Sequence, residues 1–389
     1  MQLLTNARVF APEDCGVQHL LIGGGRILAM SGNRNDLASE RATVVDIGGR
    51  RLIPGFIDGH AHVTGGGGES GFASRVPPQT LGRFTTAGVT SVVGVLGTDD
   101  TTRDTRSLLA QTHALREDGL GAWCHTGGYH LPPVTLTGSV RDDIVFLDPV
   151  IGVGEVALSD HRSSQPTCDE LLRLASDAHV AGMISGKAGI VHLHLGDGSR
   201  GLELVRHALD LSEIPGRVFN PTHVNRRKAL FDEALELTSR GCCIDITAFP
   251  VDEDEDAWPA DVALVRYLES GASPERVTIS SDGGGCLPVF DAQGEITEMD
   301  IGRPSMLIKT LEDLLKAGAA LPSVLPALTS NVASLLRFHD RGRIDAGFRA
   351  DLVVISDDHR IEEVMVAGVW HVRNGQQQLF GQFERQEQR

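Results

Sequence analysis

Two histidines stand two residues apart in the segment FIDGHAHVTGGGGES, which covers residues 56–70. The segment begins as an apolar strand, and side chains at positions i and i+2 of a strand point to the same side, so His60 and His62 converge. Imidazole is a common ligand of divalent metals, and the glycine-rich loop that follows leaves room for a substrate beside an ion. The alternative is that the two strand histidines only pack in the interior. Their spacing alone does not distinguish a metal site from interior packing.

The elements that position these histidines alternate along the middle of the chain. Short apolar runs typical of strands are followed by helical patterns at residues 108–118, 169–182, 227–241 and 305–318. The predicted strands are Phe56–His62, Val89–Val95, Ala122–Tyr129, Val150–Ser159, Ile190–Gly196, Val218–Val224, Cys243–Phe249 and Val277–Ser281. Eight strands in this order predict a (β/α)8 TIM barrel over residues 54–342.

The two ends of the chain have a different pattern. Residues 1–53 and 343–389 show short alternating apolar runs separated by turn signals, such as HLLIGGGRILAM and EEVMVAGVWHV. The economical interpretation is one small β-sandwich domain built from both termini, with the barrel as a second domain.

Further polar residues follow the ends of predicted barrel strands. His194 ends the fifth strand, His223 the sixth, and Asp282 the eighth. In a TIM barrel, side chains at the carboxyl ends of the strands meet at one face, where the chemistry of this fold takes place. With His60 and His62 they give four imidazoles and one carboxylate from four strands, which favours a metal centre over packing alone.

Composition excludes several classes of function. The 389 residues are 41% hydrophobic with a net charge of −17, which disfavours a nucleic-acid partner because phosphate contacts need a basic surface. The six cysteines show no zinc-knuckle spacing or disulfide framework. No signal peptide and no apolar stretch approaching about 18 residues is visible. We therefore expect a cytoplasmic protein with a small-molecule substrate and no membrane partner.

Several motifs resemble the amidohydrolase superfamily and, within it, the isoaspartyl (β-aspartyl) dipeptidases. PGFIDGHAH and GFRADLVV mark the superfamily, whereas GGGGE, VLGTD, TGGYH and SDHRS are more specific. The resemblance implies a metal-dependent hydrolase with two divalent ions, usually zinc, bridged by a hydroxide and a protein carboxylate. It implies that His60, His62 and Asp282 hold one ion. His194 and His223 would hold the other.

One position departs from the family pattern. Counting back from SDHRS, the place of the family's carboxylated lysine is taken by Glu155, with one apparent extra residue before it. The charge is kept but the stem is shorter, and Gly154 could let the strand bulge toward the metals. Lys187 lies in a loop before the fifth strand, so we expect Glu155 to bridge the ions directly. The alternative is a solvated carboxylate in a protein that has lost its second metal.

The resemblance also assigns catalytic and substrate-binding residues. Asp282 would accept the proton of the hydroxide and pass it to the leaving amine, and Tyr129 would stabilise the oxyanion. The expected contacts of the substrate's ammonium group and carboxylates are Gly67, Glu69, Thr98, Arg162, Arg226 and Cys286. Cys286 is a second departure, because the family commonly has a serine there and a thiol is a weaker donor.

Three other features are given a structural interpretation. The acidic run at residues 252–256 is expected to be a solvated loop, and His192 an extra core histidine, while His125 and His130 receive no role. The resulting hypothesis is a dipeptidase for β-aspartyl dipeptides, a homo-oligomer and by resemblance an octamer. The alternatives are an amidohydrolase for another small amide or cyclic imide, such as an N-acyl amino acid, and a catalytically silent barrel.

Overall fold

The strands of both chain ends form one sheet in the computed structural model, which describes residues 1–37, 41–290 and 296–384. The sheet has nine strands in the order β19-β18-β17-β16-β5-β1-β2-β3, with β4 also paired to β1. From the N-terminal end come β1 (Gln2–Phe10), β2 (Asp14–Gly23), β3 (Arg26–Ser31), β4 (Thr43–Asp46) and β5 (Arg51–Pro54). From the C-terminal end come β16 (Leu352–Ile355), β17 (Ile361–Val366), β18 (Val369–Arg373) and β19 (Gln376–Gln377).

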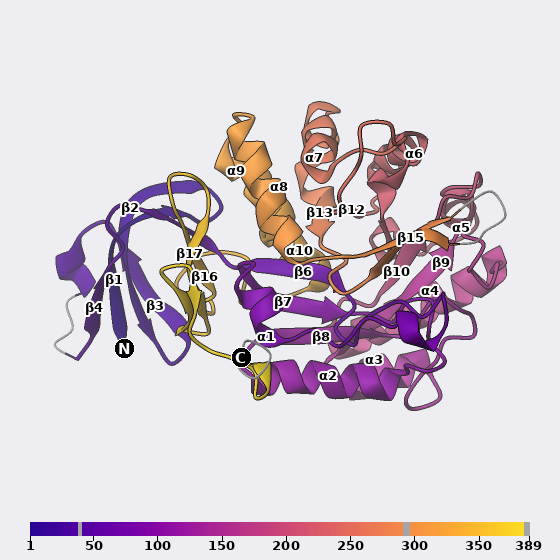
Figure 1. Cartoon of the computed structure of the whole chain (residues 1–389), viewed down its shortest axis with the longest axis horizontal. Coiled ribbons are helices and arrows are strands. Elements are labelled where there is room, and N and C mark those ends of the chain that lie inside the picture. The colour runs from indigo at the N-terminus through magenta and orange to yellow at the C-terminus, as the bar shows by residue number, and fades with distance from the viewer. Residues whose placement is uncertain (38–40, 291–295, 385–389) are drawn as a thin grey trace.

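The two ends of the chain meet where β5 and β16 pair in antiparallel register, with Leu52 opposite Val354. Figure 1 shows the indigo N-terminal strands beside the yellow strands β16 and β17. A shared core of buried side chains from both ends, including Leu4, Ile22 and Met365, packs beneath them. The composite β-sandwich predicted from the sequence is confirmed, while its limits at residues 53 and 343 stay a prediction.

All eight predicted barrel strands form, each parallel to its paired neighbours. They are β6 (Phe56–Ala61), β7 (Val89–Gly94), β8 (Gly121–Thr126), β9 (Val150–Leu158), β10 (Ile190–Leu195), β11 (Phe219–Thr222), β12 (Ile244–Thr247) and β13 (Val277–Ser280). Strands β6 to β11 make one sheet and β12 pairs with β13. The ring closes where Asp282 N donates to His60 O at 3.1 Å and His62 N donates to Gly283 O at 2.8 Å. The predicted TIM barrel is thus confirmed.

Helices cover the outside of the barrel (Figure 1). They are α1 (Leu81–Thr85), α2 (Thr105–Glu117), α3 (Val140–Phe146), α4 (Cys168–Ser185), α5 (Glu203–Leu211), α6 (Lys228–Ser239), α7 (Ala260–Glu269), α8 (Ser305–Lys316), α9 (Leu321–Val324) and α10 (Ser330–Leu336). Capping boxes at Asp104 and Thr167 start α2 and α4, where side-chain oxygens accept from otherwise unpaired backbone N–H groups. The four predicted helices are confirmed as α2, α4, α6 and α8.

Two further strands were not predicted. After the eighth barrel strand the chain forms an antiparallel hairpin of β14 (Cys286–Phe290) and β15 (Ile296–Ile301). It places Cys286 and Leu287 against the pocket described below. Across the parts of the chain that the structure describes, no helix combines the length and the apolar character needed to cross a membrane.

Candidate metal centre and substrate pocket

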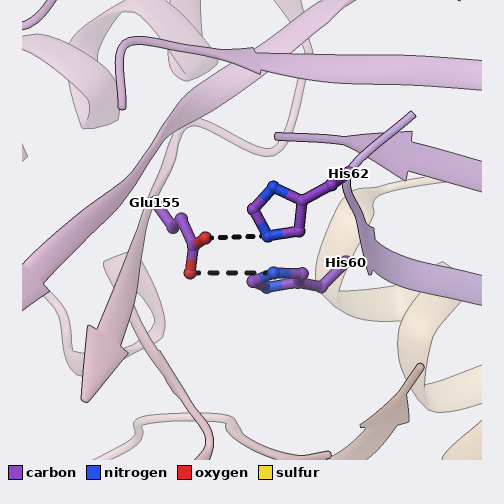
Figure 2. A group of neighbouring side chains, drawn as sticks. All are labelled: His60, His62 and Glu155. Atoms are coloured by element: carbon purple, nitrogen blue, oxygen red, sulfur yellow. Dashed lines mark ion pairs between the residues drawn. The ribbon is translucent and has the colours of Figure 1, made fainter. Parts of the chain in front are cut away.

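The six predicted metal ligands come together at the carboxyl end of the barrel strands. They are His60 on β6, His62 directly after β6, Glu155 within β9, His194 on β10, His223 after β11 and Asp282 after β13. All six side chains are buried. Figure 2 shows His60 and His62 side by side, both facing the Glu155 carboxylate. Residues from five strands or from positions directly after them thus meet at one point.

The Glu155 carboxylate lies between two groups of histidines: His60 and His62 form the first group, and His194 and His223 form the second. Its Oε1 is 3.2 Å from His62 Nε2, and its Oε2 is 3.6 Å from His60 Nε2. The same Oε2 is 3.2 Å from His194 Nδ1 and 3.4 Å from His223 Nε2. Asp282 Oδ1 faces the first group, at 3.1 Å from His62 Nε2. The carboxylate thus contacts histidines on both sides, with Oε1 beside His62 and Oε2 beside His60, His194 and His223, and a carboxylate in this position could bridge two ions.

The donor set fits divalent ions. Three atoms that face the centre, His60 Nε2, Glu155 Oε1 and Asp282 Oδ1, are buried without a hydrogen-bond partner among the described residues. Buried polar atoms normally have a partner, and an unpaired lone pair in a cluster of imidazoles and carboxylates is what a metal ligand presents. The ligand atoms also form three compact groups of three, within 4.8 Å of one another in each.

A local irregularity in β9 brings Glu155 to this place. On β10, Val191 and Leu193 are two positions apart, whereas on β9 their partners Val153 and Val156 are three positions apart, so β9 carries one extra residue as in a β-bulge. The extra residue agrees with the one counted before Glu155 in the sequence. Gly154 has φ +143, and a Cβ there would lie 2.4 Å from the His192 carbonyl oxygen. Glycine is therefore required for the bulge that lets a short side chain reach the centre.

The electrostatics of the centre call for positive charge. Burial alone would raise the pKa of Glu155, but the surrounding imidazoles, His60 foremost, hold that pKa well below its usual value. Burial would also raise the pKa of Asp282, but the imidazoles of His60 and His62 beside it lower that pKa below its usual value. Burial lowers the pKa of His62, yet these two carboxylates outweigh it and raise the pKa to about 10. The two carboxylates are thus anions, and a bound cation would balance their charge.

Each of three ligand histidines has a partner on its second ring nitrogen. His223 Nδ1 contacts Thr247 Oγ1 at 2.7 Å, and His194 Nε2 contacts Asp160 Oδ2 at 3.1 Å. His60 Nδ1 contacts His192 Nε2 at 2.7 Å. His192 is a buried core histidine as expected, but it also contacts a predicted ligand, which the sequence interpretation missed. Such partners fix the orientation of ligand rings.

A pocket of about 400 Å³ opens above the centre. Every substrate-binding residue predicted from the sequence lines it: Gly67, Glu69, Thr98, Arg162, Arg226 and Cys286. Tyr129 lines it too, with its hydroxyl 2.8 Å from His194 Nδ1, and so do four of the predicted metal ligands. Glu69 Oε2 and Thr98 Oγ1 are buried without a hydrogen-bond partner in the part of the chain that is described, which leaves them available to a ligand.

The two predicted arginines are already paired with carboxylates. Arg162 donates to both oxygens of Asp160, at 3.0 and 2.7 Å, and lies 3.4 Å from Glu69. Arg226 donates to both oxygens of Asp197, at 2.7 and 3.1 Å. Sequence reasoning missed both partners, although Asp160 stands within the quoted motif SDHRS.

A further missed residue shapes the glycine loop. Arg103 is buried and donates to the carbonyl oxygens of Gly66, Gly67 and Val76, at 2.9, 3.2 and 3.1 Å. It therefore holds the loop that carries Glu69 into the pocket. Its guanidinium follows the quoted VLGTD motif by a few residues, which is the signal that could have drawn attention to it.

The features given a structural interpretation fare differently. The acidic run is an exposed loop as expected, and one of its residues, Glu255, also lines the pocket. Lys187 donates to three backbone carbonyls at residues 144, 147 and 150, which occupies the ammonium group away from the centre. His130, given no role, contacts Asp100 at 3.0 Å.

Comparison with known proteins shows which family the chain belongs to. The profile of the amidohydrolase family matches residues 51–371. The chain belongs to this family. The crystal structure of a β-aspartyl dipeptidase from Fervidobacterium islandicum AW-1 in complex with β-Asp-Leu is similar over nearly the whole amidohydrolase chain. The two are 39% identical, with 97% of this chain and 98% of the other covered and a TM-score of 0.90.

A second crystal structure of the β-aspartyl dipeptidase from the same organism is 38% identical, covers 97% of this chain and 98% of its own, and has a TM-score of 0.88. Together the two confirm the resemblance inferred from the motifs. A curated relative, adenine deaminase 2 of Carboxydothermus hydrogenoformans, is 25% identical over 82% of this amidohydrolase. The alignment spans only 49% of that protein's own length, so it says little about substrate.

Proposed function

We propose that this amidohydrolase is a metallo-dipeptidase that cleaves β-aspartyl dipeptides. The observation that carries the proposal is the pocket itself, in which a cluster of six metal-ligand side chains lies at the floor, while Glu69, Arg162 and Arg226 are among the charged residues of the wall. A β-aspartyl dipeptide has one α-ammonium group and two carboxylates, and the Glu69 carboxylate and the guanidinium groups of Arg162 and Arg226 have the opposite charges needed to bind them. The similarity to two β-aspartyl dipeptidase structures over 97% of the chain supports the same substrate.

The metal ions would be held by the six residues on the floor of the pocket. When bound, two divalent ions lower the pKa of a water molecule and polarise the scissile carbonyl. Asp282 accepts the proton of that water, since its carboxylate faces the centre, and passes the proton to the departing amine. Tyr129 donates its hydroxyl hydrogen to the developing oxyanion, and its position beside His194 places that hydroxyl next to the ligands.

The substrate's ammonium group would be held by Glu69, whose free Oε2 is buried, together with Thr98 and the backbone of Gly67. The guanidinium groups of Arg162 and Arg226 would take the α-carboxylate and the C-terminal carboxylate. Both arginines are paired with aspartates. A carboxylate of the substrate would therefore either replace the aspartate as the partner of each guanidinium group or bind beside it.

A kinetic panel tests this assignment. We expect β-Asp-Leu to be hydrolysed with a higher kcat/KM than α-Asp-Leu, because only the β linkage places an α-ammonium and an α-carboxylate together on the acyl side. N-acyl amino acids and cyclic imides belong in the same panel as the alternative substrates. Faster turnover of any of these than of β-Asp-Leu would overturn the proposal in favour of another amidohydrolase activity.

The finer parts of the proposal concern the ions and the setting. We propose two ions per chain, with zinc the first candidate because imidazole and carboxylate ligands suit it, although manganese, cobalt and iron accept the same donors. Elemental analysis of the purified protein tests both. The cytoplasmic location stays a prediction from the sequence, and so does the homo-oligomer, an octamer by resemblance to the family.

A further inference from the structure

A row of buried polar side chains crosses the barrel interior behind His60. His60 Nδ1 is 2.7 Å from His192 Nε2, and His192 Nδ1 is 2.7 Å from Asn220 Oδ1. Asn220 Nδ2 donates to the backbone carbonyl oxygen of Cys243 at 2.8 Å. His192 and Asn220 are direct partners in the β10–β11 pairing, so their side chains share one face of the sheet. The row joins β6, β10, β11 and the start of β12 through contacts between buried groups.

The last group in the row fixes the direction of every hydrogen bond in it. A carbonyl oxygen can only accept, so Asn220 must turn its NH₂ toward Cys243 and its oxygen toward His192. His192 must then carry its hydrogen on Nδ1. A charged ring would bear a large desolvation cost at a site that is 2% exposed, between an amide and an imidazole. His192 is therefore neutral, and its Nε2 is a lone pair that accepts from His60 Nδ1–H.

The direction of these hydrogen bonds determines which ring nitrogen of His60 can bind a metal ion. In the neutral ring that binds an ion, a hydrogen on Nδ1 leaves the lone pair on His60 Nε2, which lies 3.4 Å from Asp282 Oδ1 and 3.6 Å from Glu155 Oε2. The opposite tautomer would point an N–H at the position of a metal ion and could not bind it. His223 differs, because its partner Thr247 Oγ1 can donate or accept and so imposes no direction.

We propose that His192 and Asn220 are positioning residues that set the tautomer of His60 and so the affinity for the ion that His60 holds. The inference rests on the metal centre of the proposed function and adds two residues that stand outside its ligand set. Loss of such a partner in other metal sites costs about 10- to 100-fold in affinity.

The first test compares two variants of nearly equal size. His192→Gln keeps an acceptor that can take the His60 hydrogen and a donor for Asn220, whereas His192→Met keeps the volume and loses both. Zinc affinity is measured by competition with a chromogenic chelator, and stoichiometry by elemental analysis. We expect His192→Met to bind one of the two ions about 10- to 100-fold more weakly, and His192→Gln to stay close to wild type. Wild-type affinity for both ions in His192→Met would overturn the inference.

The second test changes Asn220, at the other end of the row, so that the inference can be tested even if the variants at residue 192 fold poorly. Asn220→Asp, protonated in this dry site, can still donate to Cys243 and accept from His192, whereas Asn220→Leu can do neither. We expect only the leucine variant to lose affinity for one ion. His125→Leu controls for packing, because His125 stacks on His192 with ring centroids 5.4 Å apart. We expect it to lower Tm of the metal-free protein while both ions bind normally.

The readouts separate this inference from the proposed function. Weakened zinc binding in His125→Leu equal to that in Asn220→Leu would reduce the row to a packing role and overturn the inference. Equal affinity in Asn220→Leu and wild type would do so as well. Absence of zinc binding in the wild-type protein would instead remove the metal centre itself, whichever variant is measured.

Discussion

The side chains on the floor of the pocket leave the barrel strands or the residues directly after them, whereas those on its rim come from the loops that follow. On the floor, His60 and Glu155 are fully buried, and their positions are fixed by the strand ladders and by contacts such as that of His192 with His60. On the rim, the side chains of Arg226 and Asp197 are 22% and 64% exposed and pair with each other.

The difference teaches how the two regions handle charge. Charges on the floor are desolvated and need a cation to balance them, so the floor is built for a resident ion. On the rim, Arg226 and Asp197 already neutralise each other in a partly exposed pair, which is weak and can exchange partners. We therefore expect changes on the floor to affect metal content and changes on the rim to affect KM and substrate choice, with effects that decrease in that order.

The largest effect is expected for His60→Ala. It removes a ligand of one ion, and several kcal/mol of transition-state stabilisation should be lost, or about a thousandfold or more in kcat. Elemental analysis should show fewer than two ions per chain while circular dichroism shows an intact barrel. Normal activity in a metal-free wild-type protein would contradict the assignment of the floor to a resident metal ion. Removal of the metal with a chelator tests this directly.

Glu155→Gln is the next test of the floor. The amide keeps the shape but cannot offset two cations, and breaking a buried charge pair costs about 3–5 kcal/mol, so metal content or turnover should fall about a hundredfold or more. Because the wild-type carboxylate belongs to a glutamate, activity should also be the same with and without added bicarbonate. Unchanged metal content and rate in the variant would refute the bridging role.

On the rim, Arg226→Met should leave metal content unchanged. A charge-assisted hydrogen bond lost from a desolvated site costs roughly 1.5–3 kcal/mol, or about one to two decades in kcat/KM for free dipeptides. Asp197→Asn is the matched variant: it removes the competing charge and should lower KM. If both variants raise KM alike, the Arg226–Asp197 pair acts as a structural unit and not as an exchangeable partner.

Glu69→Gln tests the ammonium side of the rim. Its effect should be confined to substrates with a free α-amino group, at about tenfold in kcat/KM for the loss of one charged hydrogen bond. N-blocked analogues measured in parallel should show no change. An equal loss for blocked and free substrates would assign Glu69 to holding Arg162 instead.

Cys286→Ser should have the smallest effect. A hydroxyl is a better donor than a thiol, and a gain of about 0.5–1 kcal/mol gives roughly a two- to fivefold rise in kcat/KM for β-Asp-Leu. A fall in kcat/KM would mean that the pocket is shaped for the larger sulfur atom and for a different acyl group.

The sequence predicts the floor better than the rim for a physical reason. Strand periodicity places His60 and His62 on one side of β6, and the parallel order of the strands brings their ends together. The pairing of Arg226 with Asp197 depends on loop conformations that no local pattern encodes. The hairpin of β14 and β15 was also missed, because Pro288 argues against a strand in the segment that forms β14.

The pairing of β5 with β16 joins segments that lie about three hundred residues apart in the chain. During synthesis on a ribosome the first five strands can pair with one another, but the edge of β5 that pairs with β16 stays unpaired while the barrel forms. Closing so long a loop costs little extra entropy once the folded barrel holds its two ends close together. We therefore expect the folded barrel to hold the two halves of the terminal sheet together. A chain truncated before β16 should aggregate through the exposed edge of β5.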